Sequence, residues 1–456
     1  MRRGVDLTQG PILGKLFLVA LPIMATSFIQ MAYNMADMFW IGRVGYDAVS
    51  AVGTAGFFMW LSMALVSLSQ VGAQVGVSQA IGAKDYDRAE SAGRSALHLA
   101  AFNGICYMLF ALVFRHVLIQ FFAVPNPEIN LWGEQYLAIV ALGFPFSFMS
   151  MTYTSIYNGS GNSQVPLMIN AVGLVLNMVL DPLFIFGLVG FPEMGVAGAA
   201  LATVIAQTIV AGLFTWHIHS KYSPVQHFRF FKAPDFDRIK QLLKLGYPVA
   251  IQSGTFTVIA MFIARRLSDF GDMPIAVQKV GSQIEAISWM TAVGFGTALG
   301  AFVGQNYGAK AYGRIKEGYR KAVLLMFAYG TLTSLLLIFF AEPIFSVFIP
   351  DPEVIPHGAV YLRILGVSQL FMCLEISTAG AFNGMGKTVP PSVVSFIFTG
   401  LRLPVALLIS QPEILGLNGV WWTITGSSIF KGVVLVSWFV WVLKTDKRFK
   451  ALSQPL

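Results

Sequence analysis

Residues 78–97 read SQAIGAKDYDRAESAGRSAL, and residues 304–323 read GQNYGAKAYGRIKEGYRKAV. The two stretches share residue identities at a constant offset of 226 positions. Identities at one fixed spacing indicate two copies of a single unit rather than a chance of composition. The shared positions of the first stretch are Gln79, Gly82, Ala83, Lys84, Tyr86, Arg88 and Arg94.

The repeat continues beyond these stretches at an offset of 225. In an apolar chain of this length, two similar halves are typical of a transporter whose halves rock against each other around a shared cavity. The further positions that recur are Pro125, Pro127, Glu128, Tyr136 and Leu137, and then Asn158, Gly159, Gly161 and Pro166.

The composition is that of a polytopic membrane protein. The chain is 56% hydrophobic and 11% charged, whereas soluble domains carry about 25% charged residues. A mean hydropathy of +0.68 over 456 residues leaves no room for a sizeable soluble domain. Cys106 and Cys373 both lie in apolar stretches, so we expect neither a disulfide framework nor a zinc site. The first apolar run is long enough to span, so no cleavable signal peptide is predicted.

Twelve stretches are long enough to cross a bilayer, which takes about 20 apolar residues. Six fall in each half, so the predicted fold is an all-α membrane protein with twelve transmembrane helices in two pseudo-symmetric six-helix lobes. We predict an N-terminal lobe over 1–218, a cytoplasmic linker over 219–237 and a C-terminal lobe over 238–456. The predicted spans are 13–40, 50–80, 92–114, 131–156, 165–189, 195–218, 238–268, 275–302, 320–341, 356–381, 390–411 and 418–443.

The distribution of lysine and arginine predicts the orientation. With a cytoplasmic N-terminus, 22 of the 30 basic residues lie on the inside and 4 on the outside. This bias predicts cytoplasmic N- and C-termini in a bacterial inner membrane. The net charge of +8 then follows from topology, and no nucleic-acid partner is predicted. His217, His219 and His227 lie at or near the linker, where a solvated segment is favoured over a metal site.

Two carboxylates in the first half are predicted to share a depth in the membrane. Asp37 and Asp181 each precede the outer end of a span by a similar count of residues, about 9 Å for Asp37. Asn177 lies four residues before Asp181 and projects from the same helix face. Pro182 frees a backbone carbonyl beside them. Two neighbouring carboxylates at low dielectric cannot both stay ionised cheaply, so the pair is predicted to accept a proton or a cation.

Further polar residues are candidates for substrate binding. Ionisable side chains inside spans are costly and point to function by default. Glu285 lies near the midplane of its span, whereas Glu375 is as well explained by a structural pairing within the bundle. Nineteen methionines and 38 phenylalanines suit an adaptable apolar cavity. The candidate substrate-binding residues are Gln30, Tyr33, Asn34, Tyr136, Tyr153, Asn158, Gln283 and Glu285.

The halves differ at the positions of the carboxylate pair. Position 37 plus 226 is Ile263, and position 181 plus 225 is Ala406. The ion-responsive chemistry is therefore predicted in the first lobe alone. No phosphate-binding loop, metal-ligand cluster or nucleophile triad is visible, so we predict neither an enzyme nor a cofactor.

In these residues the whole chain resembles the multidrug and toxic compound extrusion (MATE) family. The set of Asp37, Asn177 and Asp181 resembles the prokaryotic DinF-type branch of that family. The motifs that carry the resemblance are Leu21-Pro22 with Asp37 and Ile41-Gly42, Gln79-x-x-Gly82-Ala83, Asn158-Gly159-x-Gly161, Asn177-x-x-x-Asp181-Pro182 and Gly304-Gln305-Asn306-x-Gly308-Ala309.

The resemblance implies a secondary antiporter that works by alternating access, and we expect the chain to act as a monomer. The first-lobe cluster would bind the coupling proton or a sodium ion, and Thr203 would complete it. The helix bent at Pro22 would be a moving part. Amphipathic organic cations are the expected substrates, because the cavity candidates are acidic and aromatic.

Three other classes are weighed against this interpretation. A lipid-precursor flippase of the same superfamily should carry basic cavity residues, whereas Lys279, Arg363, Arg402 and Lys431 are the only intramembrane bases predicted here. A major-facilitator transporter should show a basic–aspartate motif that the loop QAIGAKDYDRAE lacks. A non-transporting receptor would not need paired lobes with buried carboxylates.

Overall fold

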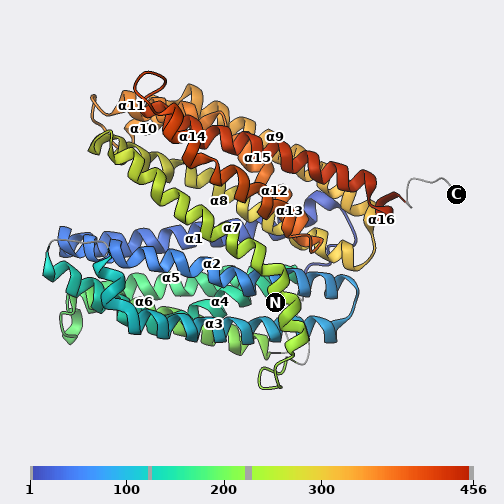
Figure 1. Ribbon diagram of the computed structural model, residues 1–456. Helices are drawn as coiled ribbons and strands as arrows, with labels where there is room; N and C mark the ends of the chain where they lie inside the picture. Colours follow the sequence, from blue (N-terminus) through green and yellow to red (C-terminus); the bar gives the residue numbers. More distant parts are fainter. Residues whose placement is uncertain (1–3, 122–125, 221–227, 451–456) are drawn as a thin grey trace. The chain divides into compact units, whose positions relative to one another are not determined.

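The structure is a computed structural model that describes residues 4–121, 126–220 and 228–450, and every regular element in these ranges is a helix (Figure 1). The first half holds α1 (Ile12–Val44), α2 (Tyr46–Gly82), α3 (Tyr86–Gln120), α4 (Pro127–Gly159), α5 (Gln164–Ile185), the short 3-10 helix η1 (Leu188–Gly190) and α6 (Gly195–Ile218). The second half holds α7 (Phe236–Ser268), α8 (Asp272–Gly308), α9 (Tyr312–Phe339), α10 (Ala341–Ser346), α11 (Ile355–Gly366), α12 (Gln369–Gly384), α13 (Val389–Gly400), α14 (Arg402–Ile409), α15 (Leu417–Thr445) and α16 (Lys447–Lys450).

The chain is a multi-pass membrane protein. Within the described ranges, 11 helices are long and apolar enough to cross a membrane, and a bent pair raises the number to 12. The pair is α11 and α12, which are bent by 46° relative to each other and cover the predicted span over 356–381. The predicted all-α fold with twelve spans is confirmed.

The helices form two compact units that exchange the beginnings of two helices. Unit 1 contains Met1–Asp6 and Leu21–Ala250, and unit 2 contains Leu7–Ala20 and Ile251–Leu456. The chain therefore changes unit inside α1 and again inside α7. Pro22 and Pro248 lie within two residues of these crossings, and a helical proline removes one backbone hydrogen bond. The predicted lobe boundaries at 218 and 238 concern the two bodies that would move during transport, and they stay a prediction.

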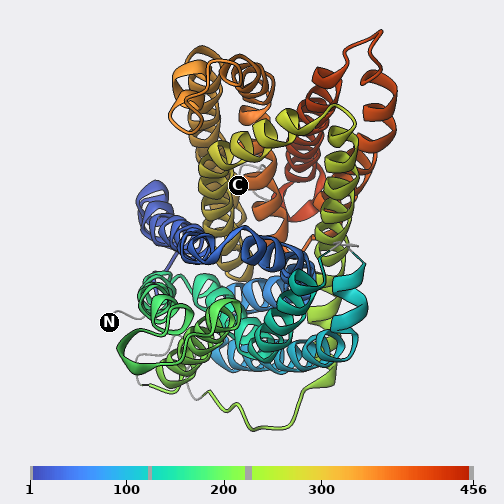
Figure 2. The same ribbon diagram turned by 90° about the vertical axis from the view of Figure 1, so that its left-hand side faces the viewer.

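Each unit is built around one central helix. In unit 1, α4 packs against α2, α3 and α6, and in unit 2, α12 packs against α8, α9 and α15. Figure 1 labels these helices, and Figure 2 views the same elements from the left-hand side of Figure 1. The repeat relates α4 to the α11–α12 pair, since Tyr136 corresponds to Tyr361. The two units are thus internally equivalent in their packing.

The repeat is visible in the backbone at the helix ends. Lys84 and Lys310 both have φ of 58°, in the left-handed region that non-glycine residues rarely adopt. In each copy two hydrogen bonds close the helix end: Asp85 N–H donates to Ala80 O and Lys84 N–H to Ile81 O, with distances of 2.9 Å each. Ala311 and Lys310 repeat this pattern at 2.8 and 3.1 Å. These are Schellman caps, which satisfy carbonyls that a helix end leaves unpaired.

The Asn-Gly-x-Gly motif also ends a helix in both copies. Gly161 and Gly386 have φ of 78° and 75° and cap α4 and α12. A methyl group added at Gly159 would lie 2.7 Å from the carbonyl oxygen of Gln74 on α2. The motif therefore allows a close approach of two helices as well as a tight cap.

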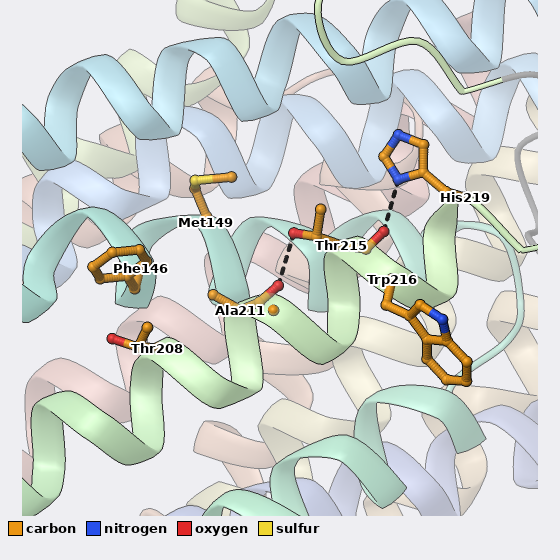
Figure 3. Close-up of a pocket in the computed structure, with 8 residues that line it drawn as sticks. Phe146, Met149, Thr208, Ala211, Thr215, Trp216 and His219 are labelled. Carbon is orange, nitrogen blue, oxygen red and sulfur yellow. Dashed lines mark hydrogen bonds between the residues drawn. The ribbon is translucent and has the colours of Figure 1, made fainter.

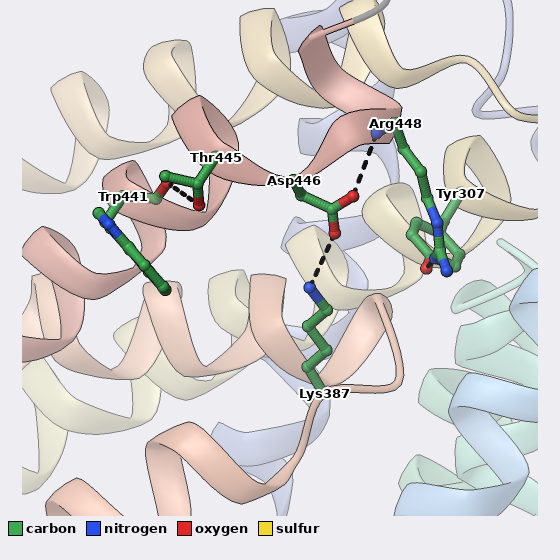
Figure 4. A network of polar contacts seen from close by, with 6 residues as sticks. All are labelled: Tyr307, Lys387, Trp441, Thr445, Asp446 and Arg448. Atoms are coloured by element: carbon green, nitrogen blue, oxygen red, sulfur yellow. Dashed lines mark hydrogen bonds and ion pairs between the residues drawn. The ribbon is translucent and has the colours of Figure 1, made fainter.

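The C-terminal end of unit 2 is held by Asp446 (Figure 4). Its carboxylate accepts from Lys387 Nζ at 3.0 Å and from the Arg448 backbone N–H at 3.1 Å. Partial burial raises the pKa of Asp446, but these two donors outweigh it and hold that pKa below its ordinary range. Arg448 also contacts the Tyr307 hydroxyl, so α16 is fastened to the end of α8.

The end of the linker docks on α3 of unit 1. Arg229 N–H donates to Glu90 Oε1 at 3.2 Å, and the Phe230 carbonyl accepts from His98 Nε2 at 2.8 Å. Asp235 caps α7, because its Oδ1 accepts from Arg238 N–H at 3.0 Å, and its Oδ2 accepts from Ser91 Oγ at 3.2 Å. The part of the linker over 221–227, which includes His227, lies outside the described residues.

Replacing the Asp235 cap should destabilise the start of α7. The Arg238 backbone N–H lowers the pKa of Asp235 below its ordinary 3.8. A lowered pKa contributes stability that is present at neutral pH and is lost as the pH falls through it. Asp235→Ala should cost about 1 kcal/mol, whereas Asp235→Asn keeps the cap. Thermal unfolding at pH 7 should rank Asp235→Ala below both the wild type and Asp235→Asn, with Asp237→Ala as a control in the same turn. Equal stability of all four proteins would show that the Asp235 cap does not stabilise the start of α7.

Candidate ion-coupling site

The site begins on one face of α5. Asn177 and Asp181 are four residues apart and fully buried, and Asn177 Nδ2 donates to Asp181 Oδ1 at 3.1 Å. Pro182 follows at once and removes a backbone donor from the same turn. The predicted i, i+4 pair is therefore formed, and it presents a carboxylate from a locally loosened helix.

Asp37 of α1 meets this pair. The side chains of Asp181, Asn177 and Thr203 all interact with the Asp37 carboxyl group. Thr203 comes from α6 and is only 1% exposed. The four residues Asp37, Asn177, Asp181 and Thr203, which we call the acidic cluster, are thus brought together from three helices of unit 1.

The acidic cluster has acceptor oxygens to spare. Oδ1 of Asp37, Oδ1 of Asn177, Oδ2 of Asp181 and Oγ1 of Thr203 are buried without a hydrogen-bond partner in the described structure. Within the described residues neither carboxylate forms an ion pair with a lysine, arginine or histidine. Such a group of oxygens with no cation at hand can hold a proton between the carboxylates or a small cation among them.

Two tyrosines border the acidic cluster. Tyr33, one turn before Asp37 on α1, interacts with Thr203. Tyr136 of α4 is 2% exposed and lies close enough to interact electrostatically with Asp37 and Asp181. Both are predicted to bind substrate, and that role stays a prediction.

The other candidates of the first half lie elsewhere. Tyr153 is fully buried, and its hydroxyl is 3.1 Å from Thr215 Oγ1 while its ring stacks on Phe214. Asn158 belongs to the cap of α4, where its carbonyl accepts from Gly161 N–H. Gln30 and Asn34 are exposed on α1. Gln30 and Asn34 share α1 with Asp37, and the part of all four residues in substrate binding stays a prediction.

The second-half candidates belong to unit 2. Glu285 on α8 interacts with Tyr361 and Gln369, and Gln283 is exposed two residues away. Glu375 on α12 forms an ion pair of 3.0 Å with Lys431 of α15. Sequence reasoning did not single out Gln369. Ile263 and Ala406, which stand where unit 1 has its carboxylates, are both buried in one hydrophobic cluster.

A separate groove lies between α4 and α6 of unit 1 (Figure 3). It measures about 590 Å³ and is lined mainly by apolar groups such as Phe146 and Met149. The hydroxyl of Thr215 donates to the Ala211 carbonyl, and His219 Nδ1 donates to the Thr215 carbonyl, both within α6 or at its end. The nearby His217 forms a hydrogen bond with Tyr157, whose hydroxyl lies 2.7 Å from His217 Nδ1. These histidines are engaged within the protein, and the groove is distinct from the acidic cluster.

Comparison with known proteins agrees with this architecture. The family model described as MatE matches residues 22–183 and 248–408. A probable multidrug resistance protein NorM of Thermotoga maritima is 30% identical over 432 residues, covering 93% of this chain and 92% of the relative. A probable multidrug resistance protein YoeA of Bacillus subtilis is 27% identical over 413 residues, covering 89% and 88%.

A solved structure supports the fold. The chain matches a MOP superfamily transporter from Pyrococcus furiosus with a TM-score of 0.88 over 100% of both chains, at 22% identity. The family match itself spans both halves of the repeat. The chain therefore belongs to the multidrug and toxic compound extrusion family, whose members are transporters and not enzymes.

Proposed function

We propose that this chain is a secondary active antiporter that exports amphipathic organic cations in exchange for protons. The observation that carries the proposal is the acidic cluster: two carboxylates meet an amide and a hydroxyl oxygen from three spans, and no basic residue in the described part of the chain is paired to them. Buried carboxylates of this kind change their charge when protons arrive, and a change of charge is what a coupled transporter needs.

The names of the relatives support drug-like substrates. Both curated relatives above are named as probable multidrug resistance proteins. The half-buried Tyr33 beside the acidic cluster offers aromatic surface to an organic cation, whereas Tyr136 is 2% exposed and supports the cluster from within α4. We propose that the protein exports such cations as a monomer in the bacterial inner membrane, and that both of its termini lie in the cytoplasm.

The helix crossings support a rocking motion. Protonation of Asp37, coupled to Asp181 and Asn177, would reshape unit 1 and release substrate outside. Pro22 stands next to the point where α1 passes from unit 2 to unit 1, so it is the proposed hinge. A bend at this place would let each unit move with little strain in the backbone hydrogen bonds of α1.

Protons are proposed over sodium as the coupling ion. The acidic cluster offers few neutral oxygens beyond Asn177 and Thr203, and sodium would need further backbone carbonyls or water. In proteoliposomes, a pH gradient at fixed sodium should drive efflux of a cationic dye, and a sodium gradient at fixed pH should not. Protein-free liposomes measure the passive leak of the dye across the bilayer. Efflux that follows sodium and ignores pH would assign the cluster to sodium, and retention of every cationic dye with either gradient would refute the export proposal itself.

A further inference from the structure

The groove on α4 and α6 is formed by residues that differ between the two copies of the repeat. At the offset of 225, its lining residues Ala211 and Gly212 correspond to Val436 and Ser437 of α15. A methyl group added at Gly212 would meet no atom within 4 Å, so the surface is open at this position. Along this face α6 therefore carries less side-chain volume than α15 does at the equivalent positions.

The groove lies on the face of α6 that points away from the acidic cluster. Gly212 follows Thr203, a member of that cluster, by about two and a half helical turns and so projects to the opposite side. Both α4 and α6 are long and apolar enough to span a membrane, and the lining residues Phe146 and Trp216 are 38% and 73% exposed. A bilayer supplies hydrocarbon to such a surface. Because the tails of all phospholipids are as apolar as these walls, any selectivity must come from the polar end of the groove.

A fixed imidazole marks that polar end. His219 follows the last residue of α6, at the predicted cytoplasmic end of the span. Its Nδ1 donates to the Thr215 carbonyl at 2.7 Å, and its ring meets the Phe228 ring edge-on at 5.7 Å (Figure 3 shows the hydrogen bond). An imidazole that donates through Nδ1 keeps a lone pair on Nε2, so neutral His219 can only accept there. Among the described residues, the Nε2 of this exposed ring has no hydrogen-bond partner.

The repeat gives unit 2 the opposite hydrogen-bonding character at the same place. Trp216 corresponds to Trp441 and His219 corresponds to Lys444, and all four side chains are exposed. Tryptophans at such helix ends are typical of the membrane interface. A lysine ammonium only donates hydrogen bonds. The end of α15 therefore suits the phosphate that all phospholipids share, whereas the end of α6 suits a headgroup that carries N–H donors.

We propose that this groove binds a phospholipid of the phosphatidylethanolamine type, with one acyl chain lying along Gly212 and the primary ammonium donating to His219 Nε2. The exposed ring of Trp216 offers its face to the same ammonium. A quaternary ammonium has no N–H group, so phosphatidylcholine cannot form the bond to His219. The site is separate from the acidic cluster, and the inference does not depend on which ion or substrate the protein transports.

Quenching of tryptophan emission by brominated lipids tests the proposal in bilayers. The purified protein is reconstituted into phosphatidylcholine with a rising fraction of either phosphatidylethanolamine or phosphatidylcholine that is brominated on its acyl chains. The emission that is lost in Trp216→Phe and in Trp441→Phe isolates the signal of each indole. Trp216 should be half-quenched at a mole fraction of the ethanolamine lipid about twofold to tenfold below that of the choline lipid, the range of one hydrogen bond. Trp441 should respond equally to both lipids.

Variants of the groove tie the preference to its two parts. Gly212→Leu fills the open space without a clash and should abolish the preference of Trp216 for the ethanolamine lipid. His219→Leu removes the acceptor and should make the two lipids equal. Unchanged quenching of Trp441 shows that each variant is folded and inserted. If Gly212→Leu does not fold, the pair Ala211→Val and Gly212→Ser, which copies unit 2, takes its place. Equal quenching of wild-type Trp216 by both lipids, or a preference that survives either variant, overturns the proposal.

Discussion

Asp37→Asn is expected to reduce gradient-driven efflux to the level of protein-free liposomes while the protein still binds substrate. Asparagine keeps the shape and the hydrogen-bonding capacity of Asp37 but cannot take up a proton. Asp37 lies at the meeting point of Asp181, Asn177 and Thr203, so its charge state governs the whole acidic cluster. Asp181→Asn should fail in the same way. Efflux of a cationic dye under a pH gradient, at matched protein per liposome, measures both.

Two variants of unit 2 separate a first-lobe mechanism from its rival. Glu285→Gln should weaken cation efflux less than Asp37→Asn, because Glu285 shares its surroundings with Tyr361, Gln369 and the field of Arg402. Glu375→Gln leaves Lys431 as a buried charge without its partner, so it should lower stability, and its efflux is compared only at matched folded protein per liposome. If Glu285→Gln is inactive while both aspartate variants transport well, the coupling site lies in unit 2.

Lys431→Met should destabilise the protein strongly. The Lys431 and Glu375 side chains are 8% and 12% exposed, and their charged groups are 3.0 Å apart. Removing one partner leaves a buried charge alone, which costs about 3–5 kcal/mol in globular proteins. The unfolding temperature in detergent should fall well below that of the wild type.

The double variant tests whether an unpaired charge is the cause. Lys431→Met combined with Glu375→Gln removes both charges and should recover most of the stability. Lys321→Met breaks the exposed pair with Glu317 and should cost less than about 1 kcal/mol. A double variant as unstable as Lys431→Met would mean that lost packing, and not charge, decides the effect.

The fold and three residues of the acidic cluster, Asp37, Asn177 and Asp181, could be predicted from the sequence, whereas Thr203 entered only through the family resemblance. Span lengths and the repeat predicted the helices, and the four-residue spacing placed Asn177 beside Asp181. Their depth in the membrane placed Asp37 near them, and the side-chain interactions agree. What these residues do in transport stays a prediction.

The sequence could not predict the contacts that depend on how each helix is rotated about its own axis. Tyr136 interacts with Asp37 and Asp181, whereas the ring of Tyr153, which stands on the same helix, stacks on Phe214. The pairing of Lys431 with Glu375 joins helices α15 and α12, and no periodicity states which faces meet. Arg402 stands at the repeat position of Asn177, but the repeat does not state that its guanidinium donates to Ser427 and Ser428.

The exchange of helix beginnings between the units has a consequence for any attempt to divide the gene. Cutting the chain in the linker would give two polypeptides, one with all of α1 and the other with all of α7. Each fragment would then lack the stub that the other fragment contributes to its unit, residues 7–20 for one and the start of α7 for the other. Separate expression should yield two incomplete products, and complementation should require that both be made in the same membrane.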